Sequence, residues 1–480
     1  MGVLLVICLA TRLYRIMEPR GVVFDEYHFG EFVNGYFSHR YFFDIHPPLG
    51  KLVLALGGLL GGYDPNGFKY ETIGKPFPRD LNYGSLRLTA AILGSMVIPV
   101  LYLTARNFRL SIEAATTAAC FLLLDMSFCI ESRLILTDSQ LLLSCAIALL
   151  CMTELWKTED GTPERTIWII LTGLGCGTAI SVKWTGLATP ALTGLISLTG
   201  IYFTRHQKRI PFYQCVLIGS IGLMFYLATW WFHFRLLYLS GPGDAFMNIK
   251  FQRTLIGNRF YNSKFPKESF LTRTYLLNKE MLRANAAITA RHPWESKWYT
   301  WPISWRGILY YVSGRREVYL VGNIVVYILV LGAVILYIPT VGLAIWNTMG
   351  RKEVTSLVTE RQKPTEDVLS VSESEILPRE MTLGRAGALG TLFFCGWGIN
   401  LLPYIGINRC AFLYHYLPGL YYGLLLFATM LDTLIRWKHA RRFIAVALIG
   451  AAATVFYLFA PLVYAYPARS RESLRWFPKW

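Results

Sequence analysis

The stretch YLVGNIVVYILVLGAVILYIPTVGLAI, residues 319–345, carries no charged side chain. It is long enough to cross a lipid bilayer, which takes about 20 apolar residues in a helix. A second uncharged run, VLIGSIGLMFYLATWW, covers residues 216–231. In lipid the backbone polar groups of such a run must be paired within the segment, and a helix does this. The sequence therefore predicts a helical membrane protein.

The composition of the whole chain agrees with this class. Of 480 residues, 54% are hydrophobic and 16% are charged, which leaves a water-soluble fold too little polar surface to cover itself. Hydropathy predicts an all-α polytopic fold with about eleven membrane-spanning helices. They lie near residues 1–16, 84–105, 110–128, 135–153, 167–182, 184–203, 212–238, 318–346, 386–405, 411–434 and 443–464.

The basic residues indicate how these helices are oriented. The formal net charge is +17, but Lys and Arg lie mostly in short segments between apolar runs, so we expect no nucleic-acid partner. The positive-inside rule places the amino terminus in the cytosol and the large polar segments on the opposite side, together with the carboxyl terminus. The first predicted helix is short, and we therefore expect further sequence before Met1.

The polar segments divide the chain into four parts. These are a membrane part, 1–240, with a first loop at 17–83, a second large loop at 241–317, a second membrane part, 318–464, and a tail, 465–480. Residues 350–384 are rich in Glu, Ser, Thr and Lys and poor in aromatics, which predicts a disordered cytosolic loop. The nine cysteines show neither CxxC nor metal-ligand spacing, so we expect packing roles and no metal site.

An acidic pair follows the first predicted helix, in the sequence FDEYHFG of residues 24–30. Carboxylates at a membrane face are costly to desolvate and acquire raised pKa values, which suits a general base. Asp25 and Glu26 are therefore candidate catalytic residues. The alternative is a solvated loop or a helix cap.

Two prolines precede an apolar run in FDIHPPLGK, residues 43–51. Pro is favoured at the first position of a helix, so His46 is expected at the amino end of a helix, where the dipole attracts anions. This predicts a phosphate site at His46, with Asp44 as a further substrate-binding candidate. The alternative is a plain helix start with a satisfied histidine.

Three cationic residues stand at the ends of predicted spans: Arg87, Arg133, which is close to Asp138, and Lys183. The predicted topology points all of them to the side of the acidic pair, where a phosphate leaving group would accumulate charge. They are candidate phosphate-binding residues. For each one the alternative is a snorkelling anchor or a structural ion pair.

Aromatic and charged side chains alternate in HPWESKWYTWP, residues 292–302, and in YHYLP, residues 414–418. An interfacial aromatic belt explains such a pattern, and so does a surface that binds a sugar or a lipid phosphate. On the second interpretation the candidate substrate-binding residues are His292, Trp294, His415 and Tyr416.

Seven motifs in order along the chain resemble those of eukaryotic protein O-mannosyltransferases. They are FDEYHFGEF, FFDIHPPLGKLVLALGG, ESRLILTDS, SVKWTGLA, GPGDAFM, NKEMLRANAAITARHPW and YHYLPGLYY. The resemblance extends over nearly the whole chain from Leu13 onward.

The resemblance implies the type C glycosyltransferase fold with about eleven spans, in the endoplasmic reticulum membrane, with a cytosolic amino terminus and a luminal carboxyl terminus. It implies transfer of mannose from dolichyl phosphate mannose to Ser or Thr of secretory-pathway proteins, by members that commonly act as dimers. It assigns the family's catalytic acidic pair to Asp25 and Glu26, the arginine of its second span to Arg87, and its HPP site to His46, Pro47 and Pro48.

The implied chemistry needs a base for the incoming hydroxyl, here Asp25, and cations for the departing phosphate. Direct attack inverts the sugar. The scheme requires no cofactor, and it leaves dependence on a divalent cation open.

The chain departs from the family pattern in two places. Only residues 248–277 separate GPGDAFM from NKEMLRANAAIT, too few for the β-trefoil MIR domain that usually stands there in the family. Glu131 stands where an uncharged residue is expected. Two other functions therefore stay open: a non-catalytic subunit of a mannosyltransferase dimer, and a polyprenyl phosphate sugar transferase with another acceptor.

Overall fold

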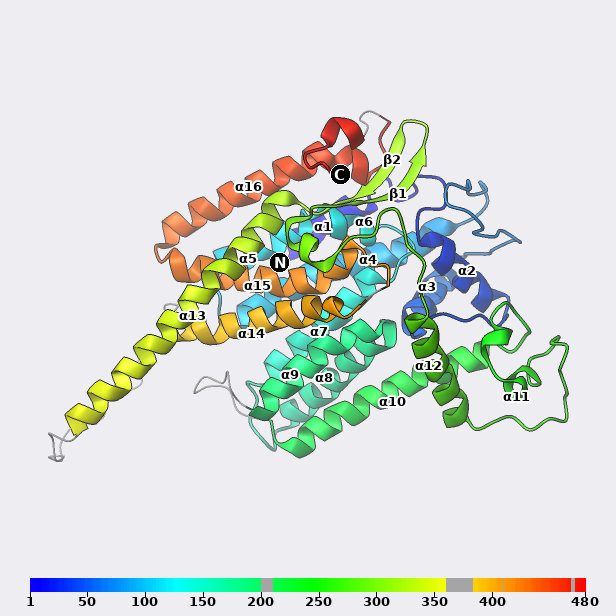
Figure 1. The fold of residues 1–480 in the computed structure, drawn as a ribbon, viewed down its shortest axis with the longest axis horizontal. Helices are drawn as coiled ribbons and strands as arrows, with labels where there is room; N and C mark the ends of the chain where they lie inside the picture. The colour runs from blue at the N-terminus through cyan, green and yellow to red at the C-terminus, as the bar shows by residue number, and fades with distance from the viewer. Residues whose placement is uncertain (200–209, 360–382, 408, 468–470) are drawn as a thin grey trace.

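The computed structural model describes residues 1–199, 210–359, 383–407, 409–467 and 471–480, with the side chains of 347–359 left out. Long helices lie side by side in a bundle, and α2, α3, α11 and the β-hairpin gather toward one end of it, on the right of Figure 1. The amino and carboxyl termini both lie within the bundle's outline in this view.

Within these described residues, eight helical segments are both long enough and apolar enough to cross a membrane. They belong to α4 (Tyr83–Asn107), α7 (Asp138–Leu155), α8 (Pro163–Val182), α10 (Phe212–Leu236), α13 (Ile324–Thr359), α14 (Leu383–Leu401), α15 (Leu417–Leu434) and α16 (Lys438–Val463). Each overlaps a span predicted from hydropathy, because the same uncharged runs supply both the hydrophobicity and the helix length.

The other three predicted spans coincide with shorter apolar helices: α1 (Gly2–Leu13), α5 (Ile112–Leu123) and α9 (Ala188–Thr199). Their described lengths are below that needed to cross a bilayer alone, so the count of eleven spans stays a prediction. The predicted helical membrane fold itself is confirmed.

Shorter elements connect the bundle. The α-helices are α2 (Glu26–Phe37), α3 (Leu49–Leu60), α6 (Met126–Glu131), α11 (Ile249–Gln252) and α12 (Phe270–Ala286). The 3₁₀ turns are η1 (Trp184–Leu187), η2 (Asp244–Phe246), η3 (Trp298–Ile303), η4 (Leu402–Ile405), η5 (Leu413–Tyr416) and η6 (Arg471–Leu474).

One antiparallel hairpin, β1 (Ile308–Ser313) and β2 (Arg316–Leu320), was not predicted. Ile308 pairs with Leu320, and a register shift between Leu309 and Tyr311 leaves Tyr310 without a partner on β2. The hairpin corrects the predicted span at 318–346, since β2 takes up its first residues and α13 begins only at Ile324. The residues VYLVGN, 318–323, carry no charge and continue the apolar run of α13, but Val318, Tyr319 and Leu320 belong to β2.

The bundle has a buried centre and a lipid-facing edge. In α15, 89% of the most apolar stretch is buried, whereas in α10 the figure is 22%. Leu223, Met224 and Phe232 of α10 are exposed apolar side chains, a surface that only hydrocarbon solvates without cost. α15 is thus a core helix and α10 a peripheral one.

α13 continues as helix to Thr359, which takes it into the segment 350–384 that the sequence predicts to be disordered. Residues 360–382 of that segment lie outside the described residues, and its last two residues begin α14 at Leu383. The four-part division of the chain stays a prediction.

Candidate active site

A cavity of about 370 Å³ lies where α2, α7, η1, α14, η4 and η5 approach one another. We call it the Asp25 pocket. The charged and polar side chains that line it are Asp25, His46, Asp138, Lys183, Asn400, Tyr404, Arg409, Tyr414 and His415. Apolar side chains of η1, α9 and α14, including Leu187 and Ile399, line its other walls. The pocket thus combines carboxylates, cations and an apolar side.

Asp25 stands at the N-cap position of α2, where Asp usually accepts a hydrogen bond from the helix backbone. Its side chain makes no such bond here and lines the pocket instead. Burial raises the pKa of Asp25 to about 7, with Asp138 and Asp44 adding to the shift and Lys183 opposing it. A carboxyl with this pKa is poised to exchange a proton near neutral pH.

Lys183 and Asp138 form an ion pair on the pocket wall. Lys183 Nζ donates to both carboxylate oxygens of Asp138, at 2.8 and 2.7 Å. Lys183 ends α8 with an extended backbone, and Asp138 begins α7. The ammonium also lies 5.7 Å from the ring centroid of Tyr414. These contacts fix the position of the Lys183 ammonium on the pocket wall.

His46 lines the same pocket, just before α3 begins. The turn that carries it is fixed by Lys51, whose Nζ donates to the backbone oxygens of His46 and Pro47, at 2.8 and 3.1 Å, and to Asp44. Burial lowers the pKa of His46 to about 3, with Lys183 contributing to the shift and Asp44 opposing it. His46 is therefore neutral and can offer a phosphate an N–H group but no charge.

Residues 2–241 match the family model described as dolichyl-phosphate-mannose-protein mannosyltransferase, and residues 270–480 match the C-terminal four TMM region of protein-O-mannosyltransferase. The chain belongs to the protein O-mannosyltransferase family. Between the two matches, residues 242–269 of this chain form η2, α11 and connecting loops. They contain no β-trefoil.

Two curated relatives show how far the protein O-mannosyltransferase likeness extends. Dolichyl-phosphate-mannose--protein mannosyltransferase 4 of Saccharomyces cerevisiae is 35% identical over 264 residues, 51% of this chain and 34% of that protein. Protein O-mannosyl-transferase 2 of Danio rerio is 34% identical over 284 residues, 56% of this chain and 36% of that protein. The matched segment thus spans about a third of each relative's length.

Among solved structures, the S. cerevisiae protein O-mannosyltransferase Pmt1-Pmt2 complex bound to the sugar donor is similar, with a TM-score of 0.82 and 19% identity. The match covers 100% of this chain and 92% of that one. This likeness confirms the predicted type C glycosyltransferase fold.

Within this protein O-mannosyltransferase fold, Glu26 and Arg87 lie outside the Asp25 pocket, contrary to prediction. Both are fully buried and form an ion pair. Glu26 Oε1 accepts from Arg87 Nε at 2.8 Å and from the Ile135 N–H at 3.0 Å. Its Oε2 accepts from Arg87 Nη2 and the Val23 N–H, both at 2.9 Å. Both carboxylate oxygens of Glu26 are thus engaged in hydrogen bonds away from the pocket.

Arg87 has no donor directed at the pocket either. Its guanidinium donates to the carbonyl oxygens of Pro19 at 3.0 Å and of Ile16 at 3.2 Å. The Glu26–Arg87 pair therefore fixes the loop that leads to Asp25.

Arg133 is likewise buried and is not among the residues that line the Asp25 pocket. It is 3% exposed, donates to the carbonyl oxygens of Arg12 at 2.5 Å and of Arg15 at 3.1 Å, and lies 4.5 Å from the Tyr464 ring centroid. These contacts tie the end of α1 to the turn after α6. Its predicted phosphate-binding role finds no support in this position.

The predicted substrate-binding residues divide in the same way. His415 lines the pocket, whereas the Tyr416 hydroxyl accepts from Trp397 Nε1 at 2.8 Å and lies in the core. The Asp44 carboxylate forms an ion pair with Lys51. His292 packs against Phe24 and Phe412, and Trp294 packs against Tyr319. Of these five candidates, only His415 reaches the pocket.

The sequence interpretation missed Arg409, Tyr404 and Asn400 as pocket residues, and it associated Asp138 with Arg133 instead of Lys183. Arg409 stands alone between the spans of α14 and α15. The signal that could have revealed it is a single cation at the end of a span, on the predicted side of the acidic pair.

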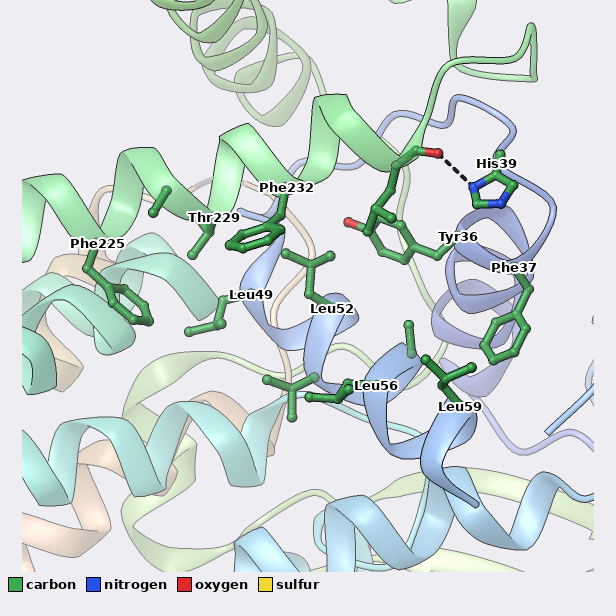
Figure 2. A pocket seen from close by; sticks show the side chains of 14 residues that line it. Tyr36, Phe37, His39, Leu49, Leu52, Leu56, Leu59, Phe225, Thr229 and Phe232 are labelled. Carbon is green, nitrogen blue, oxygen red and sulfur yellow. Dashed lines mark hydrogen bonds between the residues drawn. The ribbon is translucent and has the colours of Figure 1, made fainter. Parts of the chain in front are cut away.

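A larger cavity of about 560 Å³ lies between α2, α3 and α10. Figure 2 shows Leu52 and Leu56 of α3 facing Phe225 and Phe232 of α10 across it. Its described lining contains no Asp, Glu, Lys or Arg, so it offers neither a base nor a cation. The Asp25 pocket is the candidate active site.

Proposed function

We propose that this chain transfers mannose from dolichyl phosphate mannose to Ser or Thr hydroxyls of secretory-pathway proteins. The observation that supports this most directly is the Asp25 carboxylate, which leaves its helix uncapped and faces a pocket that also holds Lys183 and Arg409. A base and cations in one pocket are what transfer from a phosphate donor to a hydroxyl requires.

In the proposed reaction the acceptor hydroxyl oxygen attacks C1 of the mannose and forms the new glycosidic bond, while Asp25 takes the hydroxyl proton. The bond between C1 and the donor phosphate oxygen breaks, and its electron pair leaves with dolichyl phosphate. Lys183 and Arg409 stabilise the phosphate charge. A single displacement inverts the configuration at C1. The scheme uses no cofactor.

The apolar side of the pocket, formed by residues such as Leu187, Ala188 and Ile399, supports a donor that carries a hydrocarbon chain. A lipid phosphate would place its chain along this side and its phosphate toward Lys183 and Arg409. His46 and His415 would then offer N–H groups near the sugar or the phosphate. A soluble nucleotide sugar has no hydrocarbon chain to place against this apolar wall.

We also propose an endoplasmic reticulum location, with the amino terminus in the cytosol and the Asp25 pocket and carboxyl terminus in the lumen. The charge distribution between spans supports this orientation. We further propose that this chain forms a homo- or heterodimer with a family member; the similar yeast structure, a Pmt1-Pmt2 complex, supports the heteromeric form.

The test is an in vitro transfer assay on the purified full chain, alone and co-expressed with a family member, using labelled dolichyl phosphate mannose and a Ser/Thr peptide. Asp25→Asn should abolish transfer. Asp80→Asn is the matched control, because Asp80 is an exposed carboxylate in the same loop. Activity of the co-expressed pair that survives Asp25→Asn would identify this chain as a non-catalytic subunit. Transfer only to other acceptors would identify the alternative transferase.

A further inference from the structure

The residue before the proposed base has an unusual backbone. Phe24 has φ of +39°, in the left-handed region that bulky side chains rarely adopt. Such a conformation persists only where the surroundings enforce it. Phe24 is 6% exposed, so the side chains packed around its ring can enforce this backbone conformation.

Four aromatic side chains surround Phe24, and all come from the second half of the chain. The Tyr310 ring stacks on it, with centroids 4.2 Å apart and planes at 9°. Phe412, His292 and Tyr414 meet it edge-on, at 5.8, 6.2 and 6.4 Å. We call these four residues the aromatic clamp.

Tyr310 contacts Phe24 through its backbone as well as its ring. Its carbonyl oxygen accepts from the Phe24 N–H at 3.1 Å. The carbonyl is free to do this because Tyr310 is the bulged residue of β1, without a partner on β2. Bulges commonly re-aim a residue in this way next to functional sites.

The hydroxyl of Tyr310 is fixed too. It donates to Glu131 Oε1, and both side chains are 1% exposed. Glu131 thus serves as the acceptor that fixes the Tyr310 ring. Burial, reinforced by Asp138, raises the pKa of Glu131, so Gln is its closest replacement.

We propose that Tyr310, held by Glu131, is a positioning residue for Asp25. It keeps Phe24 in the left-handed conformation that directs the Asp25 carboxylate into the pocket and away from the N–H groups of α2. This rests on the proposed role of Asp25 as the base. Without the clamp, Phe24 would relax to negative φ and Asp25 would cap α2, the usual behaviour of Asp at that position.

Capping would change the acidity of Asp25 in a defined direction. Hydrogen bonds to a carboxylate favour its charged form and lower its pKa, so the acidic limb of the pH profile would move to lower pH. Other titratable and charged groups also face Asp25 from the elements around it, and of these Glu131 loses its hydrogen bond in Tyr310 variants. They are Glu131, Asp138, Lys183, Asp44, His46, Arg409, Tyr414 and His415.

The experiment compares transfer kinetics and pH profiles of full-chain variants. Tyr310→Leu should lower kcat about 100-fold, the cost of a misplaced catalytic group. Tyr310→Phe should lower it about fivefold, the equivalent of one hydrogen bond. The KM for the donor should stay within about twofold in both, because the cations that bind it are untouched. The matched control is Tyr311→Leu, a buried tyrosine on the same strand that pairs with Val318.

Two pairs of variants distinguish a positioning role of Tyr310 from a general packing role. Glu131→Gln should recover most of the activity that Glu131→Leu loses, since Gln keeps the acceptor. Phe24→Gly should be more active than Phe24→Ala, because Gly adopts positive φ without cost. An acidic limb that stays in place in Tyr310→Leu, or an Ala variant more active than the Gly variant, would overturn the proposal.

A structure of Tyr310→Leu by electron cryomicroscopy decides the matter without relying on activity. We expect Phe24 at negative φ and Asp25 bonded to the start of α2. Asp25 in its original place would refute positioning by Tyr310. Absence of transfer by the wild-type chain and by its co-expressed pair, in contrast, would count against the proposed function alone.

Discussion

Lys183 and Asp138 are joined by two hydrogen bonds of 2.8 and 2.7 Å on the wall of the pocket that holds Asp25. The pair places one positive and one negative charge near the proposed base. The two charges act on the Asp25 pKa in opposite directions, since Lys183 lowers it and Asp138 raises it. Changing either member should therefore alter the pH profile as well as the rate.

Lys183→Met should lower kcat about 100-fold, because loss of one stabilising donor to a developing anion costs about that much. Removing the positive charge also disfavours the Asp25 carboxylate, so the acidic limb of the pH profile should move to higher pH. Rate measurements from pH 5 to 9 would check both effects. Lys157→Met is the control, since Lys157 is exposed and pairs with Glu154 away from the pocket. An acidic limb that does not move would show that Lys183 does not influence the pKa of Asp25.

The wild-type chain should lose activity as the pH falls through about 7, the pKa of Asp25. Only the carboxylate form accepts a proton, and burial raises this pKa, so the active fraction falls about tenfold for each pH unit below that value. His46 does not contribute in this window, because its pKa is lowered to about 3. Donor binding measured over the same range is the control, and a flat rate between pH 5 and 8 would contradict the assignment.

The sequence predicted the helices well because long uncharged runs allow few alternatives in a bilayer. It named both Asp25 and Glu26 as catalytic candidates, with Asp25 as the base, but it contained no sign that Glu26 is engaged in a buried ion pair. The two are adjacent, and the difference is made by Arg87, which lies far along the chain and occupies both oxygens of Glu26. Such a pairing depends on tertiary packing and leaves no local pattern.

Only part of the candidate site was predicted, because the rest of it also depends on tertiary packing. Asp25, His46, Lys183 and His415 do meet in one pocket, and all four belong to motifs that resemble the family. Arg409 lies outside those motifs, and a single arginine between two spans has the pattern of a membrane anchor. The hairpin at Tyr310 was hidden because its apolar second strand runs on into α13.

Arg87→Met should destabilise the fold by about 3–5 kcal/mol, because it leaves the buried Glu26 carboxylate without its partner. Thermal unfolding in detergent would measure the loss, and Glu26→Gln combined with Arg87→Met should restore part of it. Arg316→Met is the comparison, since the Arg316–Glu18 pair is partly exposed and such pairs contribute under about 1 kcal/mol. Equal losses from both arginines would show that Glu26–Arg87 is not the structural pair we describe.

Arg409→Gln should raise the KM for the lipid donor about 10- to 100-fold, the effect of losing a charge-assisted hydrogen bond to a phosphate. kcat should fall less, because Lys183 remains to stabilise the leaving group. Inhibition by dolichyl phosphate, which carries the phosphate without the sugar, should weaken by a similar factor, which assigns the effect to the phosphate. Arg79→Gln is the matched control, an exposed arginine in the first loop. If Arg409→Gln lowers kcat with KM and inhibition unchanged, Arg409 does not bind the donor phosphate in the ground state, and Lys183 becomes its main cationic contact.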